Sequence, residues 1–210
     1  EQKKTILDVY RNELATTFPK STAVERIPMT LLADDEQLRQ ALDGLCRRDL
    51  RRGVPSLCSE LRSHLWTLQK NQYYVRTQDP VDVKAHPRYQ MFVEMVNGYV
   101  SSLEKENKFS PDDDETADPV TLFWAWFLRA GLHELAGEFS EGLALVDKCI
   151  EHTPKEVDAY ELKARLLQSL GRIQEAVTVL DTGRELDLHD RCINIHTTKY
   201  VLLAGNETEA

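Results

Sequence analysis

Residues 123–154 read FWAWFLRAGLHELAGEFSEGLALVDKCIEHTP, and residues 157–188 read VDAYELKARLLQSLGRIQEAVTVLDTGRELDL. When the first stretch is moved along the chain by 34 positions, residues of like size coincide with those of the second. The coinciding pairs are Trp126/Tyr160, Ala130/Ala164, Gly137/Gly171, Phe139/Ile173, Gly142/Ala176, Val146/Leu180 and Cys149/Gly183. Self-similarity at a fixed period of this length is the signature of a repeat architecture.

The paired positions have distinct structural roles. Trp126 and Tyr160 are large enough to anchor the first helix of each unit, and Pro154 ends a second helix. Gly137 and Gly171 suit the turn between the helices, because a left-handed backbone costs glycine least. Small residues let the paired helices approach closely; they are Ala130, Ala164, Gly142 and Ala176. The sequence therefore predicts an all-α fold, a tetratricopeptide-repeat α-solenoid, with coincidental amphipathic helices as the alternative.

This prediction divides the chain into three parts. Repeats occupy 123–156 and 157–190, with a partial third at 191–210, so the regular part covers 121–210. Residues 110–120 form an acidic loop with few apolar residues. Residues 1–109 are degenerate helical repeats, interrupted by an irregular insert at about 70–90. Apolar spacing in this first part predicts helices over 3–17, 34–50, 56–69 and 91–103.

Composition excludes two classes of partner. Lysine and arginine number 26 against 35 aspartates and glutamates, a formal net charge of −9, whereas a non-specific nucleic-acid binder needs a basic surface. The longest apolar run falls well short of the ~18 residues of a membrane span. We therefore expect no direct nucleic-acid binding and no membrane segment. Because Glu1 rather than Met opens the sequence, we also expect a piece of a longer polypeptide, cut inside its third clear repeat.

One pattern has the residue types and spacing of a metal site. It comprises Cys149-x-x-His152, His189-x-x-Cys192 and His196. The gap between its two halves is longer than that of a zinc finger, and the repeat explains both cysteines as helix-packing positions. We therefore predict no metal site.

The sequence shows no signature of catalysis. It has no nucleotide-binding P-loop, no G-x-S-x-G motif and no H-E-x-x-H motif. Carboxylate groups such as Asp34 and Asp35 fall at predicted helix caps or in loops, where solvated charge is the simpler explanation. The arginines at 47–52 close a helix, where the helix dipole favours cations. We predict a protein that is not an enzyme and requires no cofactor.

A set of cations in the second and third repeats suggests a binding site. First helices of neighbouring repeats lie side by side, so these cations are expected to converge on one polyanion despite the negative net charge. The set is Lys163, Arg165, Arg172, Arg191, His196 and Lys199. Scattered solvent-facing charges, ion-paired with Glu161 or Asp187, are the alternative.

Several motifs together resemble one family. The runs EHTPKEVDAYELKARLLQSLGRIQEA (151–176) and ELDLHDRCINIHTTKYVLLA (185–204) resemble the auxiliary subunit of the N-terminal acetyltransferase A complex. Supporting matches are RIPMTLL (26–32), RRGVPSL (51–57), GYVSSL (98–103) and FSPDDD (109–114). The most specific motif is D-R-x-I-N-x-x-x-x-K-Y at 190–200.

The resemblance implies a tetratricopeptide scaffold that wraps the catalytic acetyltransferase subunit in the cytoplasm. It also implies attachment to ribosomes through other parts of the full-length chain, and specificity for small first residues. In this family a basic pocket binds inositol hexaphosphate, and the positions that match its region are Lys163, Arg165, His196 and Lys199. This chain carries Gln168, Leu203 and His196 where the family typically has lysine, which leaves fewer charge-assisted bonds for the polyanion.

A second class of function is a co-chaperone-type tetratricopeptide domain that binds peptide tails. Proteins of that class hold the terminal carboxylate with lysine and asparagine on successive first helices. Here the corresponding positions are Phe127, Gly131 and Leu162, which carry no side-chain donor. This composition disfavours the co-chaperone function.

Overall fold

The computed structural model describes residues 2–32, 34–66 and 83–205, and every regular element in these ranges is helical. This confirms the predicted all-α class. The chain divides into two compact units. One comprises residues 1–48 and 59–92, and the other comprises residues 49–58 and 93–210. Within the described ranges, none of the helices has the length and apolar character needed to cross a membrane.

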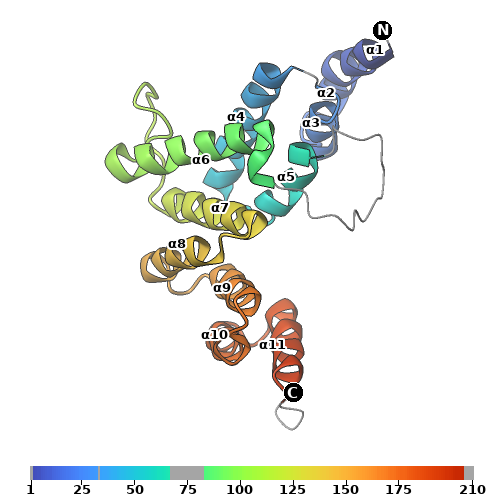
Figure 1. Cartoon of the computed structure of the whole chain (residues 1–210). Helices are drawn as coiled ribbons and strands as arrows, with labels where there is room; N and C mark the ends of the chain where they lie inside the picture. The colour runs from blue at the N-terminus through green and yellow to red at the C-terminus, as the bar shows by residue number, and fades with distance from the viewer. Residues whose placement is uncertain (1, 33, 67–82, 206–210) are drawn as a thin grey trace. The chain divides into compact units, whose positions relative to one another are not determined.

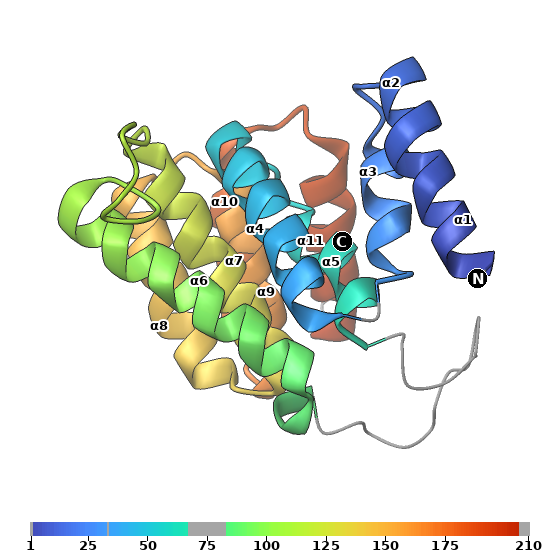
Figure 2. The ribbon, with the colours of Figure 1, turned by 90° about the horizontal axis from the view of Figure 1, so that it is seen from above.

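The first unit begins with a helical hairpin. Helix α1 (Gln2–Asp8), a π-helical segment (Val9–Leu14) and α2 (Ala15–Thr17) follow one another as one rod, and α3 (Thr22–Met29) folds back beside it (Figures 1 and 2). The predicted helix over 3–17 is therefore correct in extent, but its middle is wound more widely. The apolar pattern did not predict α3. The Ser21 hydroxyl caps it by accepting a hydrogen bond from the Val24 N–H at 3.4 Å.

Three further helices complete the first half of the chain. They are α4 (Asp35–Arg52), α5 (Leu57–Trp66) and α6 (Pro87–Glu106). Leucines spaced by four and three on α4, at 38, 42 and 45, are completely buried, as a helix with one apolar face requires. Most of the predicted insert at 70–90 lies outside the described residues. Its last part is a 3₁₀ turn (Val83–Ala85) and the start of α6.

Buried Arg88 on α6 ties two segments of the first unit together. Its guanidinium donates hydrogen bonds to Asp35 Oδ1 at 2.8 Å and to the Leu32 carbonyl at 3.0 Å. The side chain is only 9% exposed. A buried charge is tolerated when it is paired and hydrogen-bonded in this way.

The second unit contains the repeats. They are α7 (Val120–Ala136) with α8 (Phe139–His152), then α9 (Val157–Ser169) with α10 (Ile173–Leu186), then α11 (Arg191–Leu203) (Figure 1). Gly137 and Gly171 end the first helices with φ of 74° and 77°, and Gly205 follows α11 with φ of 82°. The left-handed turn that the sequence predicted is thus confirmed at each repeat position.

Small residues bring the helices of the repeats together. Ala130, Ala164 and Ala176 are completely buried, and Gly142 is buried as well. At Gly183 on α10 an added Cβ would lie 2.7 Å from Tyr160 Cβ and 2.8 Å from Ile193 Cδ1. Only glycine allows this approach. The two anchor positions differ, because Tyr160 is buried and donates to the Pro154 carbonyl at 2.8 Å, whereas Trp126 is only half-buried.

The acidic loop belongs to the second unit. It connects α6 to α7, and two hydrogen bonds fold it on itself: Ala117 N–H to the Asn107 carbonyl at 2.6 Å, and Ser110 N–H to Asp113 Oδ2 at 3.0 Å. The predicted boundary at 110–120 therefore marks where regular repeats begin, whereas the compact units are divided elsewhere in the chain.

Candidate binding surface

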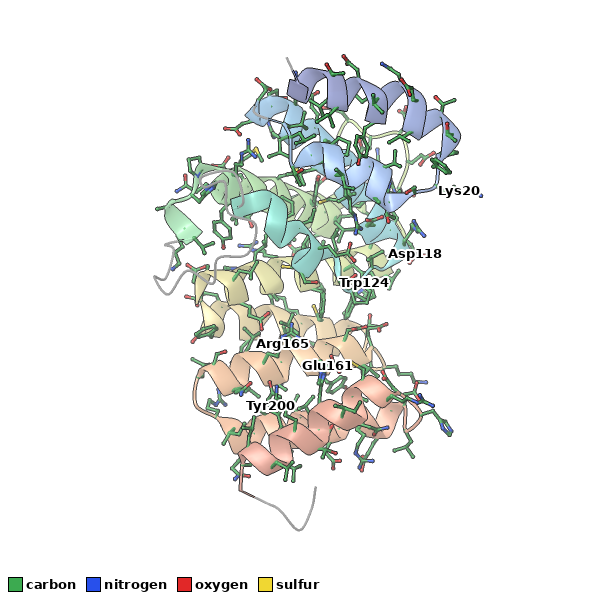
Figure 3. All side chains as sticks on the ribbon, turned by 90° about the vertical axis from the view of Figure 1, so that its right-hand side faces the viewer. Lys20, Asp118, Trp124, Glu161, Arg165 and Tyr200 are labelled. Atoms are coloured by element: carbon green, nitrogen blue, oxygen red, sulfur yellow. The ribbon has the colours of Figure 1, made fainter. Side chains whose placement is uncertain are left out.

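The first helices of successive repeats lie next to each other, α7 beside α9 and α9 beside α11. Three polar contacts connect them. Arg165 on α9 donates to Glu134 on α7 at 2.8 and 3.2 Å. Between α9 and α11, His196 lies 2.9 Å from Glu161, and the Tyr200 hydroxyl donates to Gln168 at 2.7 Å. Figure 3 labels Glu161 and Arg165 on α9 and Tyr200 on α11.

Arg165, one of the cations predicted to bind a polyanion, has its charge balanced by Glu134. The two nitrogens of the guanidinium fork meet both carboxylate oxygens, the strongest geometry for such a pair. The Arg165 side chain is 48% exposed, so the pair contributes at most about 1 kcal/mol to stability. A polyanion at this arginine would compete with Glu134.

Two more of the predicted cations point away from that contact. Lys163 Nζ lies 2.7 Å from Asp147 on α8. Arg172, in the turn after α9, donates from Nε and Nη2 to the two carboxylate oxygens of Glu175 on α10, at 2.7 and 2.6 Å. These cations and Arg165 therefore each meet a carboxylate on a different helix. These three cations are therefore ion-paired, as in the alternative to a polyanion site, but their partners are not the predicted Glu161 and Asp187.

Of the three remaining cations, Lys199 and Arg191 are exposed and make no ion pair with any residue in the described ranges. The repeat explains Lys199. It occupies the position equivalent to Arg165, and Gln168 occupies the position equivalent to Glu134. The amide of Gln168 accepts from Tyr200 instead, so Lys199 has no carboxylate at the matching place. Three of the six cations thus meet carboxylates on three different helices, and the polyanion site stays a prediction.

His196 lies among acidic groups. Its Nδ1 faces Glu161 Oε1 at 2.9 Å and Cys192 Sγ at 3.9 Å. Asp190 caps α11 by accepting from the Cys192 N–H at 2.7 Å. Burial, followed by the negative charges of Glu161, Asp190 and Asp158, raises the pKa of the Cys192 thiol. This end of the surface is therefore electronegative, the opposite of what a polyanion needs.

Asp158, in the first turn of α9, shows the effect of these charges most clearly. Burial and the neighbouring charges, first that of Glu156 and then those of Glu161 and Asp190, raise the pKa of Asp158 from 3.8 to about 6. A hydrogen bond with Glu156 acts in the same direction. Near neutral pH the ionised Asp158 carboxylate therefore lowers the stability of the folded protein.

We expect Asp158→Asn to stabilise the protein at pH 7. A carboxyl group with a raised folded-state pKa binds more protons in the folded than in the unfolded state between pH 4 and 6. Its contribution to stability is therefore fully present below about pH 4 and is lost as the pH rises through 6. Urea unfolding of wild type and variant at pH 4.5 and 7.5 measures the difference in stability at each pH, with Asp187→Asn as the control. A wild type that matches the variant at both pH values would contradict it.

The cysteines separate into different environments. Cys149 is buried with its Sγ 3.6 Å from the Phe123 carbonyl, and burial raises its pKa to about 12. It is the packing residue that the repeat predicted. That interpretation is wrong for Cys192, which is exposed and joins His196 and Glu161, whose ligand atoms all lie within 4.8 Å of one another. Sequence spacing found the cysteine and histidine but missed Glu161, because it lies on another helix.

The positions that a co-chaperone domain would use for a peptide carboxylate serve packing here. Leu162 is 1% exposed, Phe127 is 8% exposed, and Gly131 is buried with Cys58 Sγ 2.8 Å from where its Cβ would be. Two polar side chains that the sequence did not predict as neighbours lie beside Trp126. The Trp126 Nε1 donates to Glu104 at 3.0 Å, and Lys148 Nζ lies 5.7 Å from the centroid of the Trp126 ring.

The paired helices, left-handed glycine turns and 34-residue period define a helical-repeat protein of the tetratricopeptide class. Residues 1–210 match the family model described as N-terminal acetyltransferase A, auxiliary subunit. The chain belongs to this family, which confirms the resemblance that the motifs indicated.

Individual relatives agree with the family match. The chain is 28% identical over 205 residues to "N-alpha-acetyltransferase 16, NatA auxiliary subunit" of Homo sapiens, covering 97% of this chain and 21% of that protein. It is 31% identical over 198 residues to "N-terminal acetyltransferase A complex auxiliary subunit NAA15" of Arabidopsis thaliana, covering 94% of this chain and 20% of that protein. The chain thus spans about a fifth of the length of these relatives.

A solved structure has the same fold. The structure titled "Structure of Naa15/Naa10 bound to HypK-THB" contains a chain that superposes with a TM-score of 0.76 at 21% identity. The match covers all of this chain and 27% of that one. At this identity the similarity shows the helical-repeat fold alone.

Proposed function

We propose that this chain is part of a non-catalytic scaffold that binds and positions the catalytic subunit of a protein N-terminal acetyltransferase. The family match over residues 1–210 carries the proposal, because the family is described as the auxiliary subunit of such an enzyme. The structure with the same fold is titled as a complex with Naa10 and HypK-THB, which supports an assembly role for helical repeats of this kind. Stacked repeats present long, continuous surfaces to a partner.

The interhelix contacts suggest how the repeats serve such a role. The pairs Glu134–Arg165 and Gln168–Tyr200 each connect the first helices of neighbouring repeats. A scaffold must hold its repeats in a fixed register so that a large partner meets one surface, and pre-organisation lowers the cost of binding. The cytoplasmic, ribosome-associated location and the inositol hexaphosphate site implied by the resemblance stay predictions.

We expect the tagged full-length protein, purified from its own cells, to retain a catalytic acetyltransferase subunit. Mass spectrometry identifies the subunit, and the eluate should transfer acetyl groups to peptides that begin with serine or alanine. The control is the 210-residue chain alone, for which we expect no acetylation above the uncatalysed rate. Recovery of heat-shock proteins without an acetyltransferase would favour the co-chaperone alternative, and acetylation by the chain alone would contradict a non-catalytic role.

A further inference from the structure

Three side chains of the types that bind transition metals converge between α9 and α11. Glu161 extends from α9, and Cys192 and His196 extend from α11, where a spacing of four residues places them on one face. The carboxylate, thiol and imidazole ligand atoms all lie within 4.8 Å of one another. Figure 3 shows Glu161 on α9 beside α11.

The separations suit one shared ion. A tetrahedral zinc ion, with bonds of about 2.3 Å to sulfur and about 2.0–2.1 Å to nitrogen and oxygen, separates its ligand atoms by roughly 3.4–3.6 Å. His196 Nδ1 lies 2.9 Å from Glu161 Oε1 and 3.9 Å from Cys192 Sγ. These two distances fall on either side of the expected value, and every pair of ligand atoms lies within 4.8 Å.

The backbone that carries the ligands is fixed by its own hydrogen bonds. Asp190 Oδ1 accepts from the Cys192 N–H at 2.7 Å, and Asn194 donates to the Leu188 carbonyl at 3.0 Å. On the other side, Glu161 lies between the buried residues Tyr160 and Leu162 of α9. The Glu161 side chain is only 16% exposed. A ligand set held by packed helices needs little ordering when the ion binds.

The surrounding charge favours a cation. Asp158 and Asp190 add two carboxylates close to the cluster, and the nearby Arg165 guanidinium is already paired with Glu134. A divalent ion would offset the negative charge that these groups concentrate.

We propose that Glu161, Cys192 and His196 bind one divalent transition-metal ion of the zinc class, which bridges the second and third repeats. The thiolate and imidazole select zinc-like ions over magnesium and calcium, which take oxygen ligands. Three protein ligands leave the fourth tetrahedral position for water. The ion would crosslink α9 to α11. This inference is independent of the proposed scaffold function and assigns His196 to a cation rather than to a polyanion.

Cobalt(II) titration of the full-length protein, reduced and freed of metal, tests the site. We expect a thiolate-to-cobalt charge-transfer band with visible absorption typical of tetrahedral cobalt, and we expect added Zn²⁺ to abolish both. Cys192→Ser should remove the charge-transfer band. His196→Asn and Glu161→Gln should weaken Co²⁺ and Zn²⁺ binding about tenfold or more, since even residues outside the ligand set can change affinity by about that factor.

Matched variants separate this site from other metal-binding groups. Cys58→Ser and His189→Asn change the same residue types outside the cluster, and we expect both to leave the spectrum and the affinity unchanged. Far-ultraviolet circular dichroism establishes that each variant keeps its helices. A spectrum without the thiolate band, a band that persists in Cys192→Ser, or equal affinities for His196→Asn and His189→Asn would each overturn the proposal.

Discussion

Phe123→Ala is expected to lower the free energy of unfolding by about 3–5 kcal/mol, the usual cost of removing a large aromatic side chain from a packed interior. Phe123 is completely buried at the start of the first repeat. Its ring meets Trp124 edge-on at 4.8 Å between centroids and stacks on Phe127 at 6.1 Å. Its carbonyl also faces the Cys149 thiol on α8. Truncation leaves a cavity that these rings cannot fill without moving the helix pair.

Urea unfolding followed by circular dichroism measures the loss, and Trp126→Ala is the matched control. Trp126 is three residues further along the same helix but is half-buried, and its indole donates to an exposed carboxylate. We expect a clearly smaller destabilisation there, because partial burial contributes less transfer free energy. Equal losses in the two variants would contradict the larger contribution that complete burial gives Phe123.

Gly183→Val should destabilise the protein by about 2–3 kcal/mol, towards the upper end of the range for overpacked interiors. An added Cβ would lie 2.7 Å from Tyr160 Cβ, an atom fixed to the α9 backbone, and 2.8 Å from Ile193 Cδ1 on α11. Both helices would have to move away from α10. We therefore expect the junction of the second and third repeats to loosen first.

Gly98→Val is the matched control for this substitution. Gly98 lies inside α6, is exposed, and has nothing within 4 Å of its added Cβ. Since glycine is the poorer helix former by a few tenths of a kcal/mol, we expect a small gain or no change. The midpoints of urea unfolding compare the two variants. Equal losses at 98 and 183 would show that glycine is not required for close packing at 183.

The repeats were predictable because their signals are local and recur. Gly137 and Gly171 each mark a left-handed turn, and the need for glycine there comes from the local backbone conformation alone. Ala130 and Ala164 recur at one period because each faces the same kind of neighbour. The wider winding of Val9–Leu14 leaves no such signal, because the apolar spacing of the segment fits an ordinary helix.

The carboxylate partners of the predicted cations were not predictable, for a different reason. A helical period gives the face on which a cation lies, but it does not identify the acid that the cation meets. Glu134 and Asp147 lie on earlier helices, and they capture Arg165 and Lys163. Glu161 likewise joins Cys192 and His196 only after α9 and α11 pack together. Such partners depend on tertiary geometry, which one sequence does not contain.

The change from Glu134 to Gln168 at equivalent repeat positions gives the two junctions different sensitivities to solution conditions. The contact between α7 and α9 is an ion pair, which added salt weakens by screening. The contact between α9 and α11 combines a neutral hydrogen bond, Gln168 with Tyr200, and a histidine–carboxylate pair. One junction thus depends on an ion pair alone, whereas the other includes a neutral hydrogen bond. A chain built from one repeated unit thereby joins its repeats in two chemically different ways.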